Sequence, residues 1–393
     1  MPLDFQEVRK QIKEFAEGVP AREEKLRSLL DTARGLLTRY ALEGAYLRDK
    51  IERAANLNTY FRSAIPTDEA LNETFPLPEL PGRVTVIAAD GSQINPDRHL
   101  GIEYCLVNVG AIQMVLGEPA PPETIIQTQL FYGDEVFSMQ EKVVALIRDM
   151  REREVLAELA EPISGPIITM TDGPIELWGK EVAMAAQEEE EEKNYFERHM
   201  KALHKLYTMK AATAGYVDKP RSDLLVRLLE IAPEDKNLEK AGKDRWLRGI
   251  IDKDLLEPWL GPGERSAIFG LQSRSSKRYQ NQFSLHFFYL NVSLHERKKL
   301  FARVEVPAWV VQNPVMVDAL HAVLVQQCQV VPTKQYPYLL TRADETAVVS
   351  RDEKEQVDNM IAQELYRYGQ AVPEKSQKQQ SKEVARRKPK RNR

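Results

Sequence analysis

Val84-Thr85-Val86-Ile87-Ala88-Ala89-Asp90-Gly91-Ser92 is the stretch that decides the fold. It begins with apolar and β-branched residues, a composition typical of a buried strand. Asp90 and Gly91 follow directly, and a glycine after an aspartate favours a tight turn. We therefore expect the strand to end here, with the Asp90 carboxylate at its tip.

A second stretch repeats this pattern further along the chain. Residues 166–170 read as another buried strand, and Asp172 and Gly173 follow it. Either aspartate alone could simply accept hydrogen bonds from the backbone of its turn. Two such carboxylates in one domain could instead form half of a site for Mg²⁺ or Mn²⁺, ions that prefer oxygen ligands.

The residues around these stretches predict a mixed α/β protein. Residues 102–116 read as strand, and residues 140–159 have the pattern of an amphipathic helix. The order strand, strand, helix, strand favours a mixed β-sheet flanked by helices.

The sequence before and after this core suggests three regions. Residues 1–82 are expected to form a helical region, broken at Gly18-Val19-Pro20, and a proline-rich connector. Residues 83–370 are expected to form the main domain. Residues 371–393 hold nine Lys or Arg and two Asp or Glu, so they predict a disordered basic tail that adds affinity for DNA phosphates.

Composition excludes several classes of protein. No apolar run is long enough to cross a membrane, and the first residues do not read as a signal peptide. Cys105 and Cys328 lie in apolar sequence and read as buried thiols, which favours a cytoplasmic protein. Motifs for phosphate loops, dinucleotide folds, serine hydrolases and zinc proteases are absent from the sequence.

A third carboxylate is expected from the helix between the two aspartates. Each candidate could also be an ordinary solvent-exposed residue of the helix surface. The candidates are Asp149, Glu152, Glu154, Glu158 and Glu161.

Six segments together resemble one family, the NurA nucleases, which are partners of the hexameric HerA ATPase. The resemblance covers about residues 84–350. The segments are ADGS at 89–92, TDGP at 171–174, AGYVDKPRSDLL at 214–225, PGERSAIF at 262–269, RVEVPAW at 303–309 and YPYLLTRADETAVVSRDEKE at 336–355.

The resemblance implies an RNase H-like fold and a DNA nuclease that uses one or two Mn²⁺ or Mg²⁺ ions. It implies 5′–3′ exonuclease activity at DNA ends, together with endonuclease activity on single strands. It also implies a homodimer that works with a HerA-type hexameric ATPase in DNA end processing, repair or defence.

The resemblance further assigns site residues. Asp90 and Asp172 resemble the catalytic aspartates, and the family's spacing selects Glu154 as the helix glutamate. Tyr336 resembles a late active-site tyrosine, and Asp344 stands where the family usually has histidine. The four carboxylates are expected to hold the metal, and all five residues to be catalytic.

Basic residues near the motifs are expected to guide DNA, although each could serve solubility or ion pairing instead. They are Lys219, Arg221, Arg265 and Arg274.

Two other functions stay open at this point. The aspartate at position 344 leaves room for a catalytically weakened DNA-binding adaptor that regulates a HerA-type motor. The carboxylate set also suits an enzyme that cleaves RNA or RNA–DNA hybrids.

Overall fold

The computed structural model describes residues 3–97, 103–133, 136, 139–177, 186–234, 238, 243–294 and 299–370, with the backbone alone for 186–192. The basic tail expected at 371–393 lies outside these residues. The chain forms two compact units, each assembled from separate stretches. Unit 1 comprises Met1–Leu80, Gly173–Glu176 and Ala214–Tyr336, and unit 2 comprises Pro81–Asp172, Leu177–Thr213 and Pro337–Arg393.

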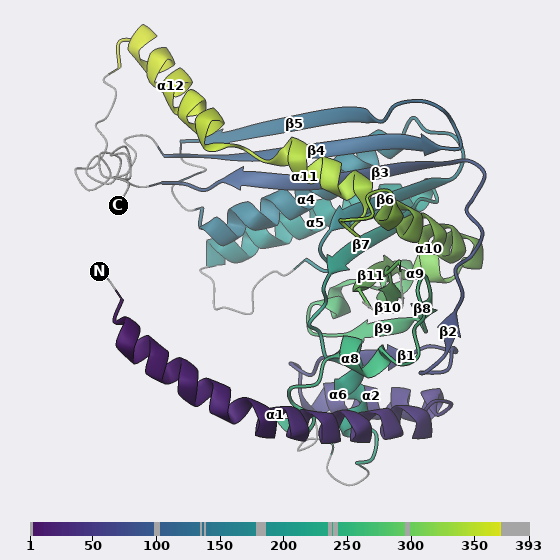
Figure 1. Ribbon diagram of the computed structural model, residues 1–393. Coiled ribbons are helices and arrows are strands. Elements are labelled where there is room, and N and C mark those ends of the chain that lie inside the picture. Colours follow the sequence, from purple (N-terminus) through teal and green to yellow (C-terminus); the bar gives the residue numbers. More distant parts are fainter. Residues whose placement is uncertain are drawn as a thin grey trace. The chain divides into compact units, whose positions relative to one another are not determined.

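Unit 1 begins with one long helix, α1 (Phe5–Arg39), capped by the Asp4 side chain. The expected break at residues 18–20 is wrong, because the helix continues through Pro20. Proline lacks only one backbone donor, and a long helix can absorb that loss by bending. Figure 1 shows α1 as a curved helix.

The rest of unit 1 is an antiparallel sheet with short helices. Its strands lie in the order β1-β9-β10-β11-β7. They are β1 (Ser63–Pro66), β9 (Phe269–Gln272), β10 (Leu285–Asn291), β11 (Phe301–Pro307) and β7 (Ala212–Asp218). A short pair, β2 (Thr74–Phe75) and β8 (Arg265–Ser266), adjoins β10. The helices are α2 (Gly44–Leu57), α6 (Leu224–Ile231), α8 (Asp252–Leu256), α9 (Ala308–Val311) and α10 (Pro314–Gln329).

A buried carboxylate joins three of these elements. Asp252 is 0% exposed and accepts hydrogen bonds from the Val226 amide at 2.9 Å and the Tyr289 hydroxyl at 2.6 Å. Burial raises the pKa of Asp252 to about 7, although both hydrogen bonds oppose this shift. The Asp252 carboxyl group therefore links α6 to β10 through hydrogen bonds, although burial disfavours its charged form.

Unit 2 is built on a mixed sheet with strands in the order β6-β3-β4-β5. The strands are β3 (Val84–Ile94), β4 (Tyr104–Leu116), β5 (Glu123–Tyr132) and β6 (Ile167–Asp172). β3, β4 and β5 are antiparallel neighbours, whereas β6 runs parallel to β3. This confirms the mixed sheet that was predicted.

The first strand differs from the expectation in one respect. β3 does not end at Asp90 but continues to Ile94, so Asp90 lies inside the strand and pairs with Gly110 of β4. The turn prediction was wrong because cross-strand pairing with the 13-residue β4 outweighs the local turn preference of Asp-Gly. The second strand does end at Asp172, as predicted.

Helices cover both faces of this sheet (Figure 1). α4 (Glu141–Ala160), which confirms the predicted helix, packs on one face, and α5 (Ala186–Thr208) packs against α4. α11 (Tyr338–Ala347) lies on the other face, followed by α12 (Arg351–Arg367). Residues Val349, Val357 and Ile361 pack there against Ile94, Tyr104 and Leu106.

A glycine allows α11 to lie directly on β4. A Cβ at Gly110 would lie 2.6 Å from the Ala343 carbonyl oxygen and 2.7 Å from the Ala347 amide nitrogen. The Ala347 carbonyl also accepts hydrogen bonds from Ser92 Oγ at 2.5 Å and Asn108 Nδ2 at 2.8 Å. These contacts fix the position of the helix on the sheet.

Two further expectations concern the chain as a whole. Cys105 and Cys328 are both buried free thiols, as predicted. Among the helices of the described stretches, none is both long enough and apolar enough to span a bilayer.

We predict that Asp252→Asn flattens the dependence of stability on pH. The folded state raises the pKa of this carboxyl, so its contribution is largest at low pH and declines as pH rises from about 4 to 7. The parent should lose on the order of 3 kcal/mol more unfolding free energy than the variant over this window. Urea unfolding between pH 4 and pH 8 measures this, and parallel curves for both proteins would contradict it.

We also predict that Gly110→Ala destabilises unit 2 by about 1–3 kcal/mol, because the new methyl group collides with α11 backbone atoms that cannot rotate away. Thermal and urea unfolding measure the effect. Gly82→Ala is the matched control, since a Cβ there meets nothing within 4 Å. Equal stability of the two variants would show that α11 does not need the glycine.

Candidate active site

Two aspartates are brought together by neighbouring parallel strands. The register of β3 and β6 pairs Ala89 with Thr171. Asp90 and Asp172 are the next residues of the two strands and therefore point to the same face of the sheet. The pair anticipated from the sequence thus forms on adjacent strands of unit 2.

Asp344 joins this pair from α11. Gly110 pairs with Asp90 across the sheet, and it is also the residue on which the α11 backbone rests at Ala343. The next residue of the helix is Asp344, and its charge acts on the Asp90 carboxyl. The three aspartates from β3, β6 and α11 are called the acidic cluster below.

Electrostatics inside the acidic cluster favour a bound cation. Burial, and to a smaller extent the negative charges of Asp172 and Asp344, raise the pKa of Asp90 to about 6. The Gly91 amide, at 2.8 Å from Asp90 Oδ1, and the Arg148 guanidinium act in the opposite direction. A cation between the carboxylates would relieve their mutual repulsion.

The α4 glutamate on whose carboxyl the Asp90 charge acts is Glu152. A Cβ at Gly91 would lie 2.9 Å from Glu152 Oε1 and 2.6 Å from Cγ of Arg148, so the glycine lets α4 approach β3 closely. Glu152 is only 4% exposed. Burial raises its pKa well above the usual range, and the charges of Asp149 and Asp90 add to the shift.

Arg148 is the cation next to these acids. It lies 2.7 Å from Asp149 Oδ1 and 3.7 Å from Glu152 Oε1. Burial lowers the pKa of Arg148, but the charges of Asp149, Glu152 and Asp90 raise it above its ordinary value. The guanidinium therefore stays charged and partly offsets the negative charge of the site.

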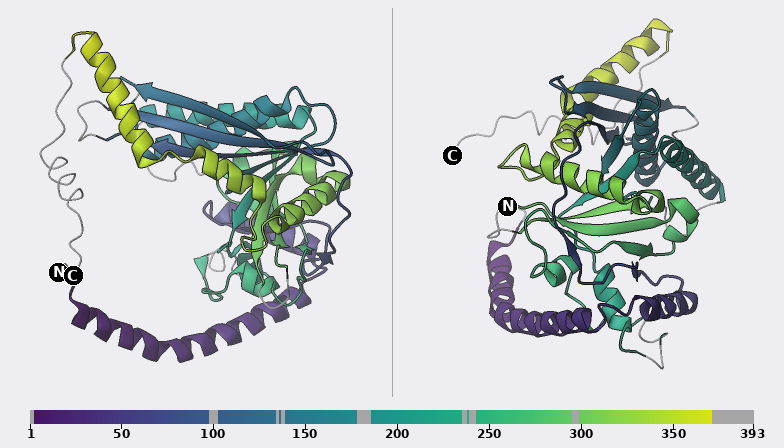
Figure 2. Two further views of the ribbon diagram at one scale, coloured as in Figure 1. Left: turned by 45° about the horizontal axis from the view of Figure 1, so that its top comes forward. Right: turned by 90° about the vertical axis from the view of Figure 1, so that its right-hand side faces the viewer.

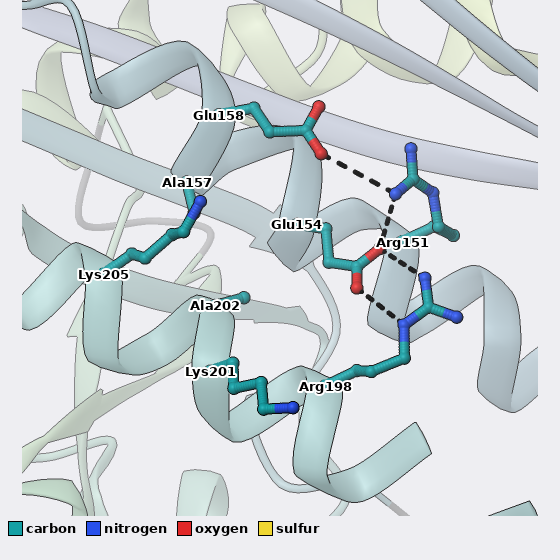
Figure 3. Close-up of a pocket in the computed structure, with 8 residues that line it drawn as sticks. All are labelled: Arg151, Glu154, Ala157, Glu158, Arg198, Lys201, Ala202 and Lys205. Atoms are coloured by element: carbon teal, nitrogen blue, oxygen red, sulfur yellow. Dashed lines mark hydrogen bonds and ion pairs between the residues drawn. The ribbon is translucent and has the colours of Figure 1, made fainter. Parts of the chain in front are cut away.

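The structure does not bring Glu154 to the acidic cluster. Its carboxylate accepts hydrogen bonds from Arg198 at 2.9 Å and from Arg151 at 2.5 Å. These residues lie on a charged face of α4 that meets α5. Figure 3 shows these ion pairs at the wall of a cavity of about 220 Å³. Glu158 lines the same cavity and lies 3.7 Å from Arg151.

The remaining residues named from the sequence belong to unit 1. The Tyr336 ring packs edge-on against Tyr216, with centroids 5.4 Å apart. Arg265 is 5% exposed, pairs with Glu69 at 3.1 Å and lies over the Phe75 ring. That environment explains Arg265 as a structural residue.

The three other expected DNA-guiding cations lie at the surface of unit 1. Lys219 and Arg221 are exposed in the segment after β7, and Lys219 has Asp218 at 3.5 Å. Arg274 is exposed beside Tyr60, over whose ring its guanidinium lies at 5.4 Å. All three side chains are thus accessible to a ligand in solution.

The donor set of the acidic cluster suits a hard divalent ion. It consists of carboxylates alone, which are the ligands that Mg²⁺ and Mn²⁺ prefer. Within the described stretches, no three His, Cys, Asp or Glu side chains are already arranged closely enough to hold an ion. The site is therefore a set of converging acids that a cation would draw together, with waters and substrate oxygens completing its ligands.

Comparison with known proteins gives one family and several distant structures. The family model described as NurA domain matches residues 84–349. The crystal structure of the NurA nuclease from Sulfolobus solfataricus is 14% identical, with a TM-score of 0.48 over 87% of this chain and 98% of that chain. A second NurA crystal structure is 11% identical, with a TM-score of 0.42 over 87% and 97%. Endonuclease V from Bacillus subtilis is 11% identical, with a TM-score of 0.31 over 71% and 82%.

No functionally curated protein matches the chain. The family match nevertheless spans most of the sequence, and it includes Asp90, Asp172 and Asp344. These are the residues that the structure gathers in the acidic cluster. The chain belongs to the NurA family of nucleases.

Proposed function

We propose that this protein is a metal-dependent DNA nuclease that hydrolyses phosphodiester bonds at the acidic cluster. The observation that carries the proposal is the convergence of Asp90, Asp172 and Asp344 from three separate elements, close enough for two of them to raise the pKa of the third. Gathering like charges destabilises a fold, so such a cluster indicates a functional demand for a cation.

Asp90, Asp172 and Asp344 are the residues that would hold Mn²⁺ or Mg²⁺, with Glu152 as the carboxylate from α4. One or two bound ions would activate a water for in-line attack on the phosphodiester and stabilise the leaving oxygen. Arg148 limits the net negative charge that an approaching phosphate meets. Glu152 lies buried against β3 at Gly91, on the face of the sheet that α4 covers, and the Asp90 charge acts on its carboxyl.

The finer properties follow the family resemblance. The nuclease acts on DNA ends as a 5′–3′ exonuclease and also cleaves single strands internally, in end processing, repair or defence. It works as a homodimer with a HerA-type hexameric ATPase. The resemblance also makes Tyr336 a catalytic residue, and the exposed Lys219, Arg221 and Arg274 guide the DNA strand.

The competing function is a catalytically weakened adaptor that binds DNA and regulates the motor. It rests on Asp344, which replaces the histidine usual in the family. Cleavage of labelled linear DNA with Mn²⁺, Mg²⁺ or EDTA separates the two functions. Parallel reactions on RNA and RNA–DNA hybrids test the substrate.

Asp90→Ala should lower the rate of DNA cleavage by at least about 100-fold, because it removes the most buried carboxylate of the cluster. Thermal unfolding of the variant should match or exceed that of the parent, since the charge repulsion is also removed. The rate on end-labelled DNA with Mn²⁺ is the measurement. A variant that cleaves at the parent rate would overturn the proposed site.

Glu152→Gln and Glu154→Gln form a matched pair that identifies the helix carboxylate. Both keep side-chain volume and remove one charge from α4. We expect Glu152→Gln to lower cleavage by about 100-fold, because the charges of Glu152 and Asp90 act on each other. Glu154→Gln should stay close to the parent rate and lose only its ion pairs with Arg151 and Arg198. The opposite order of effects would assign the role to Glu154.

A further inference from the structure

The β5 strand of unit 2 presents an open edge. The strand β5 (Glu123–Tyr132) pairs with β4. It is the last strand in the order of unit 2. Among the described strands, none other pairs with it. Figure 2 shows β5 as the outermost of these strands. Such an edge exposes a row of backbone donors and acceptors that can pair with another strand.

Three large hydrophobic side chains of β5 are exposed. Ile126 is 59% exposed, Leu130 41% and Tyr132 68%. These residues alternate along the strand and therefore share one face of the sheet. Ile126 pairs with Gly110, so this is the face on which α11 lies.

The usual protections of an edge strand lie only at the start of β5, where Pro121 and Pro122 precede Glu123. From Thr124 to Tyr132 the strand contains no charged residue and no proline. Monomeric proteins commonly place lysine, proline or a bulge at such a position to prevent pairing. A long, uncharged and partly apolar edge is therefore a surface suited to another strand.

The sequence of β5 matches itself when it is reversed about Thr128. In an antiparallel pair centred on this residue, Ile126 of each copy faces Leu130 of the other, and Thr124 faces Tyr132. On the opposite face, the same register sets Ile125 against Phe131 and Gln127 against Gln129. Each cross-strand pair joins side chains of compatible polarity, and no like charges meet.

We infer that β5 pairs with β5 of a second copy of this chain, in an antiparallel register centred on Thr128. The contact is two-fold symmetric, so one strand supplies both halves of the interface. It joins two four-stranded sheets edge to edge and covers the exposed faces of Ile126 and Leu130. This inference rests on the homodimer of the proposed function. It adds the surface through which the two copies bind.

The first test uses cysteine and a short bifunctional maleimide. Thr128 stands opposite itself in the proposed register, so Thr128→Cys should give a cross-linked dimer in high yield. Thr124→Cys is the matched control, because it is also exposed on β5 but faces Tyr132 of the other copy. The native Cys105 and Cys328 are buried, which keeps the background low.

A mixture of Ile126→Cys and Leu130→Cys proteins should also cross-link, whereas either protein alone should not. Cross-linking of Thr124→Cys, or none at Thr128→Cys, would overturn the proposed register.

The second test breaks the interface. Leu130→Lys places a charge opposite Ile126 of the other copy and should convert the dimer to a monomer in light scattering after gel filtration. Val315→Lys is the control, since Val315 is 76% exposed on α10 of unit 1. A dimeric Leu130→Lys protein, or a monomeric parent, would overturn the interface.

A nuclease assay on the same preparations separates this inference from the proposed activity. A parent protein that cleaves DNA as a monomer would overturn the interface alone. A parent that cross-links through Thr128→Cys but cleaves nothing would overturn the nuclease alone.

Discussion

The close approach of α11 to β4 is the constraint on which the acidic cluster depends. Gly110 has no side chain, so the backbone at Ala343 can rest on the sheet. The same glycine pairs with Asp90, which places the helix directly above that aspartate. Asp344 is therefore positioned by packing and by the hydrogen bonds to the Ala347 carbonyl. A larger residue at position 110 would separate the third acid from the first two.

The acidic cluster and the buried Asp252 show two uses of a carboxylate whose charged form is disfavoured. Both have a pKa raised mainly by burial. Asp252 accepts hydrogen bonds from two donors, which join helix α6 to strand β10. Burying this carboxyl therefore serves the stability of the fold alone. Asp90 instead faces two further acids, whose repulsion a ligand can remove. The difference lies in what surrounds each group, since both are aspartates in or beside regular structure.

The local parts of this structure could be predicted from the sequence, and the long-range parts could not. Periodicity and β-branched residues predicted the strands that carry Asp90 and Asp172, and these strands are neighbours. Local turn preference failed at Gly91, because pairing with β4 extends the strand. The choice of glutamate on α4 depends on which face meets the sheet. Glu154 shares its face with Arg151 and Glu158, because residues three and four positions apart lie on one side of a helix.

The contact made by α11 joins residues more than 200 positions apart, and no local pattern encodes that distance.

Asp90, Gly110 and Ile126 lie in one row across three neighbouring strands. In a sheet continued through β5, this row fixes the distance between the two acidic clusters. Strands lie about 4.8 Å apart and residues about 3.4 Å apart along a strand, so five strand steps and a four-residue offset separate the two copies of Asp90 by about 28 Å. A two-fold axis perpendicular to the sheet keeps both on one face. B-form DNA rises about 3.4 Å per base pair, so the two clusters would address positions roughly eight base pairs apart on one duplex.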